Sequence, residues 1–494
     1  MRRIFSSFSA SCLALSAVFL AGCAVGPDFD APAAPSIGTY DSEPTPDVTA
    51  DRGQVVLPGM DIPAQWWALF HSDSLNHLVT QAIKDNPDLA SADASLRVAE
   101  DELAAGETLL FPTVSGSLAS QRQKVSAVSN GGVASIYTLH NASVGVSYSL
   151  DIWGGTRRAI EQLQARADAA RFQKEAAYLA LTSNVVTAAI QEASLREQIT
   201  AMREIISNQE KTLKVLEARF EAGAVDKSAV LEQQAALAAA KTNLPPLEHQ
   251  LVVARHALTA LIGQLPPSAP TEKFKLNELA LPPQVPLSLP SRLVEQRPDI
   301  REAQENLHAA SAAIGIAEAA RLPNILLSAD IGSMATIFSK LLTPGGGFWS
   351  LGGSATETIF DAGALSDKED AARDAYAAAE ARYRKTVVAA FQNVADTLHA
   401  LQSDAESLNA KRDAEKAAAD SLALTQARFA AGAIGVVELL NAQQSEEQAK
   451  IALVQARAQR YADTAALFAA LGGGWWNRDA EANSPAPETP APNL

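Results

Sequence analysis

The stretch Asn86-Pro87-Asp88-Leu89 recurs later in the chain as Arg297-Pro298-Asp299-Ile300, at an offset of 211 residues. A second proline follows each stretch at the same distance, because Pro112 and Pro323 each lie 25 residues after the first proline. Proline is favourable in the first turn of a helix and unfavourable inside it. Each copy therefore predicts a helix of about 24 residues.

The agreement between the two copies continues far downstream. Leu150-Asp151 matches Phe360-Asp361 at an offset of 210, and the stretch from Ala218 to Ala224 matches the stretch from Ala427 to Ala433 at an offset of 209. The spacing drifts by only two residues, so chance is a poor explanation. We interpret the chain as an internal duplication of one structural unit.

Each copy is predicted to contain two strands after its first helix. In the first copy, apolar side chains from Val144 to Ile152 alternate with glycine and polar residues, which is typical of a sheet with unlike faces. In the second copy, the strands are expected at Ile325 to Ile331 and within Phe348 to Phe360. Gly131-Gly132 and Gly345-Gly346-Gly347 mark the turns between strands.

A very long helix follows in each copy, predicted at about 156–221 and 364–430, and neither contains proline. Two sets of residues keep coiled-coil spacing: Ile199, Met202, Ile206, Leu213, Leu216 and Phe220, with Gln209 interrupting, and Phe391, Val394, Leu398, Leu401, Ala405 and Leu408. Such a helix would be about 100 Å long. This length exceeds what an ordinary globular core needs and indicates a spanning structure.

Both long helices are expected to end at a glycine, Gly223 or Gly432, and to reverse into return helices at about 226–264 and 435–471. Pro245-Pro246 is expected to interrupt and kink the first return helix, because each ring removes a backbone donor and clashes with the preceding turn. The second return helix contains no proline, so the halves are not equivalent.

The amino terminus carries an export signal. Residues 1–22 combine Arg2-Arg3 with an apolar stretch and small residues, which is typical of a secretory signal peptide. Leu20-Ala21-Gly22-Cys23 resembles the bacterial lipobox, in which the leader is cut before a cysteine that becomes acylated. The alternative is a plain signal peptide with an incidental cysteine. Ala24 stands where an aspartate commonly retains lipoproteins in the inner membrane, so the resemblance implies an outer-membrane anchor.

The repeat and the proline-rich stretches divide the chain. The predicted segments are a lipoprotein signal peptide at 1–22, a lipid-anchored Pro-rich segment at 23–65, a first structural repeat at 66–264, a Pro-rich linker at 265–290, a second structural repeat at 291–472 and a disordered tail at 473–494.

Composition excludes several classes of function. A formal net charge of −16 argues against nucleic-acid binding, which requires basic residues to neutralise phosphates. The two cysteines, Cys12 and Cys23, both lie at the extreme amino terminus, and the seven histidines show no metal-binding spacing, so no metal site is expected. Nucleotide-binding and nucleophile motifs are missing from the sequence, so we do not expect an enzyme.

The strands pose a geometric problem. A membrane-spanning sheet must close into a barrel, and the smallest known types need about eight strands. Four strands per chain cannot close, but three chains would supply twelve. The predicted fold is mainly α with a small β part, and strands from several copies could close a barrel that the long helices continue as a tube. The alternative is a small soluble sheet beside a periplasmic coiled coil.

The sequence resembles the outer-membrane factor family, the TolC-like proteins of tripartite efflux and type I secretion systems, and in particular its NodT-type lipoproteins. The motifs that carry the resemblance are Cys23 to Phe29, Trp66-Trp67 with Phe70, the paired proline starts, Leu150 to Gly154 and the two A-R-F-x-A-G-A turns. Their joint order covers essentially the whole mature chain.

The resemblance implies a homotrimeric channel for small toxic compounds or drugs, located in the bacterial outer membrane and extending into the periplasm. In this architecture long coiled-coil helices form a periplasmic α-barrel, and four strands per chain contribute to a trimeric 12-stranded transmembrane β-barrel. The implied partners are outer-membrane lipid, a periplasmic adaptor (membrane fusion protein) and an inner-membrane pump, of the RND type. No cofactor is implied apart from lipid covalently attached to Cys23. Two alternatives stay open: a channel for type I protein secretion and a structural periplasmic coiled-coil lipoprotein.

The resemblance also implies roles for particular residues. The adaptor would contact two turns, Ala222-Gly223-Ala224 and Ala431-Gly432-Ala433, although both are also explained as simple helix caps. Glu438 and Asn441 fall where many relatives place two acids around the closed periplasmic aperture. Asn441 is neutral, so one charged ring is expected, and Glu438 could instead be a solvated helix charge. Ala229 and Ile434 occupy the positions of an ion pair that closes the tip in some relatives.

Aromatic residues form two further groups. Trp66, Trp67 and Phe70 are expected to pack in the belt around the helices and not to form a ligand site. The aromatic residues that flank the strands are expected either to form a girdle at the level of the lipid headgroups or to pack in the core or in turns. These residues are Tyr137, Tyr148, Trp153, Phe348 and Trp349.

Overall fold

The computed structural model describes residues 24–41, 54–128, 131–269 and 272–478. The predicted lipid-bearing Cys23 and most of the predicted tail lie outside these ranges. The described residues fold into two compact units, one comprising residues 24–32, 95–170 and 302–384, the other the described residues within 33–94, 171–301 and 385–478. Each unit thus combines residues from both halves of the sequence.

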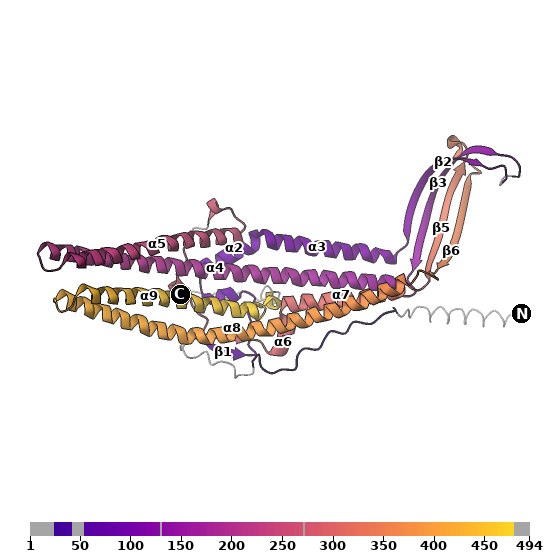
Figure 1. Ribbon diagram of the computed structural model, residues 1–494. Coiled ribbons are helices and arrows are strands. Elements are labelled where there is room, and N and C mark those ends of the chain that lie inside the picture. Colours follow the sequence, from indigo (N-terminus) through magenta and orange to yellow (C-terminus); the bar gives the residue numbers. More distant parts are fainter. Residues whose placement is uncertain (1–23, 42–53, 129–130, 270–271, 479–494) are drawn as a thin grey trace, which may run out of the picture. The chain divides into compact units, whose positions relative to one another are not determined.

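The same order of elements occurs twice along the chain (Figure 1). The first copy contains α2 (Asp73–Asp85), α3 (Pro87–Glu107), β2 (Thr113–Val125), β3 (Ser135–Leu150), α4 (Gly155–Glu221) and α5 (Lys227–Leu261). The second contains α6 (Pro290–Gln296), α7 (Pro298–Ala319), β5 (Asn324–Ala335), β6 (Gly347–Thr356), α8 (Ala364–Ala430) and α9 (Val436–Ala470). The predicted long helices are confirmed, and both have 67 residues.

The repeated motifs act as helix starts. At α3, the Asn86 side chain accepts hydrogen bonds from the backbone N–H groups of Asp88 and Leu89, at 2.9 and 3.0 Å. Before α4, Asp151 accepts from the N–H of Thr156 at 2.8 Å. Its counterpart Asp361 accepts from the N–H groups of Leu365 and Gly363, which hold the pKa of the Asp361 carboxyl below its usual value. The motifs therefore satisfy the free N–H groups at helix amino termini.

One compact unit contains a four-stranded antiparallel sheet in the order β2-β3-β5-β6. Strands β3, β5 and β6 overlap the ranges expected from the sequence, and β2 is the first strand of its copy, which was expected without a range. Gly131-Gly132 and Gly345 adopt the positive φ angles expected of turns. Strands β2 and β3 are consecutive in the chain, as are β5 and β6, and β3 is joined to β5 through α4, α5, β4, α6 and α7. The sheet therefore has two edges, β2 and β6.

A second, smaller sheet is not expected from the sequence. It pairs β1 (Val55–Pro58) in parallel with β4 (Gln284–Leu287), which lies in the stretch predicted to be a proline-rich linker. Proline lacks an N–H donor and is tolerated in strands only where that donor is not required. A sheet of two strands has only edges, so Pro286 fits there.

The predicted coiled-coil seams contribute to the helical core of the other unit. Leu216, Leu401 and Ala405 are fully buried, and the remaining seam residues are buried or half-buried with one exception. The exception is Phe220, which is 43% exposed, so its predicted place in the seam is wrong within this chain. Phe220 belongs to the last turn of α4, where the helix leaves the seam for the reversal.

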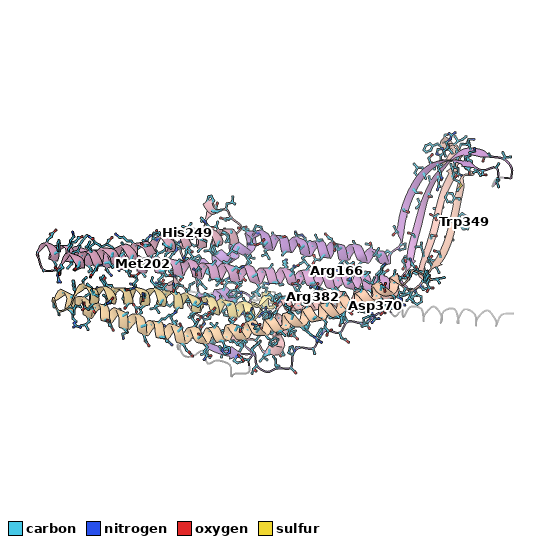
Figure 2. All side chains as sticks on the ribbon, in the orientation of Figure 1. Arg166, Met202, His249, Trp349, Asp370 and Arg382 are labelled. Atoms are coloured by element: carbon cyan, nitrogen blue, oxygen red, sulfur yellow. The ribbon has the colours of Figure 1, made fainter. Side chains whose placement is uncertain are left out.

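The predicted interruption at Pro245-Pro246 is also wrong, because α5 continues through both prolines. Leu244 and Leu247 flank them and pack against a buried cluster that includes Met202 of α4 and Leu237 of α5. Figure 2 labels Met202 on its helix. Burial on both sides of the prolines offsets the lost backbone hydrogen bonds, so tertiary packing overrides the local preference.

Trp66, Trp67 and Phe70 pack in the interior, as predicted. They form the short helix η2 (Trp66–Phe70) and are at most 3% exposed. The Trp66 ring stacks on Phe468 of α9 with ring centres 5.5 Å apart. Within the described ranges, no helix contains an apolar stretch long enough to span a membrane.

Candidate functional site

The segment that follows Cys23 is held on the start of α4. The guanidinium of Arg158 donates hydrogen bonds to the carbonyl oxygens of Val25 and Gly26, at 3.0 and 3.2 Å, and to the Asp28 carboxylate at 2.8 Å. The side chain of Arg158 is only 6% exposed, and Glu161 neutralises it at 2.7 Å. An arginine buried in this way holds the segment through its backbone.

Close backbone contact on α7 completes this attachment. Gly26 has a φ of +90°, and a Cβ built on it would lie 2.4 Å from the Cα of Gly315. The Phe29 ring stacks on His308, with ring centres 4.4 Å apart. Only glycine combines this backbone conformation with so close an approach. The C-A-V-G-P-D-F motif therefore has a structural basis in its glycine and its aspartate.

The attachment lies beside the ends of two strands. The N–H of Val25 donates to the carbonyl oxygen of Trp153 at 2.9 Å, three residues after β3 ends. The indole N–H of Trp153 donates to Pro323, which directly precedes β5, also at 2.9 Å. Trp153 is thus a packed turn residue, in line with the alternative given for it.

The sheet itself has one apolar and one polar face. Residues paired directly across strands share a face, so the register defines rows of neighbours. Two apolar rows are Val114, Val146, Ala329 and Leu351, and Gly116, Val144, Ile331 and Trp349. Two polar rows alternate with them: Ser115, Gly145, Asp330 and Ser350, and Thr113, Ser147, Ser328 and Gly352.

The apolar face is exposed. Leu118, Ile331, Trp349 and Leu351 are between 66% and 76% exposed, and Figure 2 labels Trp349 among the side chains of the sheet. Tyr148 of this face is half-buried, as are Tyr137 and Phe348, which lie on the opposite face. An apolar face of this size is rarely left in water by a soluble protein and marks a surface that another medium or molecule covers.

The two predicted tips are helix reversals with the same geometry. Gly223 and Gly432 have φ angles of +72° and +73°, and each donates its N–H to a phenylalanine carbonyl, Phe220 at 2.9 Å and Phe429 at 3.0 Å. Figure 1 shows the α4–α5 and α8–α9 turns at the ends of their helix pairs. Ala222, Gly223, Ala224, Ala431, Gly432 and Ala433 are all exposed. Both turns are therefore accessible and have small side chains.

A residue outside the predicted set joins the two tips. Arg219, in the last turn of α4, donates hydrogen bonds to the carbonyl oxygens of Phe429 and Ala430 at the end of α8, at 3.0 and 2.9 Å. Its guanidinium also lies 4.9 Å from the centre of the Phe429 ring. Cations are favourable at helix carboxyl termini, where carbonyl groups lack partners. The repeated A-R-F motif contained this signal, but spacing alone did not assign it a partner.

The candidate aperture residues lie just after the second tip. Glu438 and Asn441 are on α9 and both are exposed. Ala229 and Ile434, the positions at which the resemblance implied an ion pair, belong to an apolar cluster with Leu216, Phe429 and Leu439. Contacts near the tip are thus apolar at these two positions.

Comparison with known proteins places this architecture in a family. The family model described as outer membrane efflux protein matches residues 78–264 and 289–473, which are the two copies of the repeat. The antibiotic efflux pump outer membrane protein ArpC of Pseudomonas putida is 30% identical over 97% of this chain and 98% of its own. The probable outer membrane lipoprotein SilC of Salmonella typhimurium is 28% identical over 95% of this chain and 99% of its own.

A solved structure agrees with this assignment. The outer-membrane channel OprN superposes with a TM-score of 0.85 and 26% identity, covering 92% of this chain and 100% of that one. The expected resemblance is confirmed across both copies of the repeat. The chain is a member of the outer membrane efflux protein family.

Proposed function

We propose that three copies of this chain form a channel that carries small toxic compounds or drugs across the outer membrane. The four-stranded sheets of three protomers would close a twelve-stranded barrel, and the helices would continue it as a tube in the periplasm. The observation that carries the proposal is the separation of apolar and polar faces in a sheet with two unpaired edges.

The physical argument concerns those edges and faces. Backbone groups at the edge of a sheet cannot remain unpaired in lipid, so a membrane sheet must close on itself. One sheet with edges β2 and β6 closes when β6 of each copy pairs with β2 of the next. The rows of Val146 and Val144 would then face lipid, and the rows of Ser115 and Thr113 would line the lumen.

Acylation of Cys23 would supply the anchor. Arg158 and Gly315 hold residues 25–28 at the end of the sheet, which would place the lipid at the membrane surface. Several acyl chains give stable attachment, whereas a single chain binds only marginally. The name of SilC, a lipoprotein, supports the same anchor. The segment boundaries expected from the sequence, 1–22, 23–65, 66–264, 265–290, 291–472 and 473–494, belong to this proposal.

The proposed partners act at the tips. A periplasmic adaptor would bind the exposed turns around Gly223 and Gly432, and an inner-membrane pump of the RND type would deliver the cargo and the energy. The chain itself would be a passive conduit without catalytic activity. Glu438 would form one ring of three carboxylates around the aperture, and the neutral Asn441 would leave the second ring uncharged, so the aperture should attract cations.

The decisive experiment measures conductance of the purified full-length protein in planar bilayers, together with its mass in detergent. We expect a trimer that conducts with a preference for cations. A protein that is monomeric and fails to conduct under any voltage or salt condition would contradict the proposal. Restoration of drug resistance in cells that lack their own efflux channel, with the matching adaptor and pump present, tests the physiological role.

A further inference from the structure

The contact between the two tips runs from the first copy of the repeat to the second. Arg219 of the first copy binds the helix terminus at Phe429 and Ala430 of the second copy. The Phe429 ring lies against the guanidinium and is 7% exposed. The donor comes from one copy and the acceptors from the other, so the contact is heterologous, like a head-to-tail interface between subunits.

The reverse set of groups is present and solvent-exposed. At the offset of 209, Arg219 corresponds to Arg428, Phe429 to Phe220 and Ala430 to Glu221. Arg428 is exposed, and Phe220 is 43% exposed against 7% for its counterpart. The carbonyl oxygen of Phe220 accepts from Gly223 just as that of Phe429 accepts from Gly432. One chain therefore contains a second donor and a second acceptor end that do not meet each other.

We propose that these groups meet between subunits: Arg428 of one protomer binds the α4 terminus at Phe220 and Glu221 of a second copy of this chain. The inference rests on the proposed trimer and identifies the contact that closes its ring at the tips. A heterologous contact repeated from copy to copy either closes into a ring or continues as a filament. Three chains would then have six tip contacts of two similar kinds, three within chains and three between them.

Two features suit the intersubunit contact to a second copy. Phe220 is a large apolar side chain that is 43% exposed within the chain. The guanidinium of Arg428 from a second copy would cover its ring, as the guanidinium of Arg219 covers the ring of Phe429. Glu221 stands where Ala430 stands in the intrachain contact, so the subunit contact adds a carboxylate to two helix carbonyls. Charge complementarity of this kind specifies the register between subunits.

Cross-linking of the full-length protein tests the contact directly. Phe220→Cys with Arg428→Cys, treated in membranes with a short bifunctional maleimide, should yield covalent dimers and trimers on denaturing gels. The matched pair Arg219→Cys with Phe429→Cys should be bridged inside one chain and migrate as a monomer, with the linked peptides identified by mass spectrometry. A 220–428 bridge found only within monomers, or no bridge while the matched pair reacts, overturns the proposal.

A charge exchange provides an independent measurement. Arg428→Glu should lower the temperature at which the trimer dissociates in detergent, and adding Glu221→Arg should recover at least half of that loss. A purely local role of Arg428 in α8 would not respond to a change at Glu221. Lys416→Glu, at an exposed position of the same helix, makes the same charge change and should leave the dissociation temperature in place.

An unchanged dissociation temperature in Arg428→Glu, or no recovery in the double variant, also overturns the inference. These outcomes are distinct from failure of the proposed function. If the proposed function were wrong, the unmodified protein would neither form trimers nor conduct. A conducting trimer without the 220–428 bridge would keep the channel and reject only this contact.

Discussion

Arg158 Nη2 lies 2.8 Å from Oδ1 of Asp28, and this pair joins the first turn of α4 to the segment five residues beyond Cys23. The Asp28 side chain is 97% exposed and the Arg158 side chain 6% exposed. An exposed carboxylate contributes at most about 1 kcal/mol to such a pair. The attachment must therefore depend mainly on the bonds from Arg158 to the carbonyl oxygens of Val25 and Gly26.

The first prediction separates these two contributions. Arg158→Ala should release residues 24–32 and lower the free energy of unfolding by about 2 kcal/mol, because the carbonyl oxygens of Val25 and Gly26 lose their hydrogen-bond donor. Asp28→Ala should have a small effect. Limited proteolysis of the amino-terminal segment and thermal unfolding measure both. Equal effects of the two variants would show that the carboxylate, not the backbone, holds the segment.

The second prediction concerns the close approach of Gly26 to α7. Gly26→Ala should displace the segment, because the new Cβ would lie 2.4 Å from Gly315 Cα and the φ of +90° is strained for alanine. Gly38→Ala is the matched control, since a Cβ there meets nothing within 4 Å. Protease sensitivity near residue 30 should rise in the first variant and stay unchanged in the second. Resistance of Gly26→Ala to cleavage would contradict the contact.

The third prediction is a pH dependence that arises from Asp404 of α8. Burial, with hydrogen bonding to Asp463 and the negative charge of that residue, raises the pKa of Asp404 to about 7. The folded protein thus holds a proton that the unfolded chain releases above about pH 4. Stability from this group is complete below that pH and is lost as the pH rises through about 7.

Replacing the carboxyl with an amide should remove the penalty at high pH. Asp404→Asn should raise the melting temperature by about 2 °C at pH 8 and leave it nearly unchanged at pH 5. Asp413→Asn, at an exposed position of the same helix, serves as the control in the same melting experiments. A gain from Asp404→Asn that is the same at both pH values would rule out the titration.

The fourth prediction concerns the charge at the aperture. In planar bilayers, Glu438→Ala should weaken the preference for cations and open the channel further, because three carboxylates around an axis attract cations and repel one another. Asn441→Asp should strengthen the preference by restoring a second ring. Reversal potentials in asymmetric salt report both changes. If the unmodified protein, Glu438→Ala and Asn441→Asp showed the same ion selectivity, Glu438 would be a solvated surface charge and not part of the aperture.

The fifth prediction tests the anchor. Cys23→Ser should abolish acylation and signal cleavage at the lipobox, so the variant should lack the mass of the acyl groups and retain residues 1–22. Intact-protein mass spectrometry of the membrane fraction measures this directly. If Cys23→Ser carried the same added acyl mass as the unmodified protein, Cys23 would be refuted as the lipid-bearing residue. Cys12→Ser, inside the predicted leader, is the control and should leave the mature mass unchanged.

The sequence alone determined the order of elements, because that order depends on local signals. The paired prolines start α3 and α7, Asp151 and Asp361 cap the next long helices, and Gly223 and Gly432 end them. Each signal acts within a few residues of its own position, so it can be recognised without knowing any partner. The strands were likewise predictable from alternation and from their glycine turns.

Tertiary structure decided everything that depends on a partner distant in the chain. It kept α5 continuous through Pro245-Pro246, it paired β1 with β4 across more than 200 residues, and it removed Phe220 from the seam. It also selected Arg219 to bind the end of α8 while the identical residue type at Arg428 stayed exposed. A repeated sequence specifies two equal tips, and only packing of one copy on the other makes them unequal, because a head-to-tail contact uses one donor and leaves the next one open.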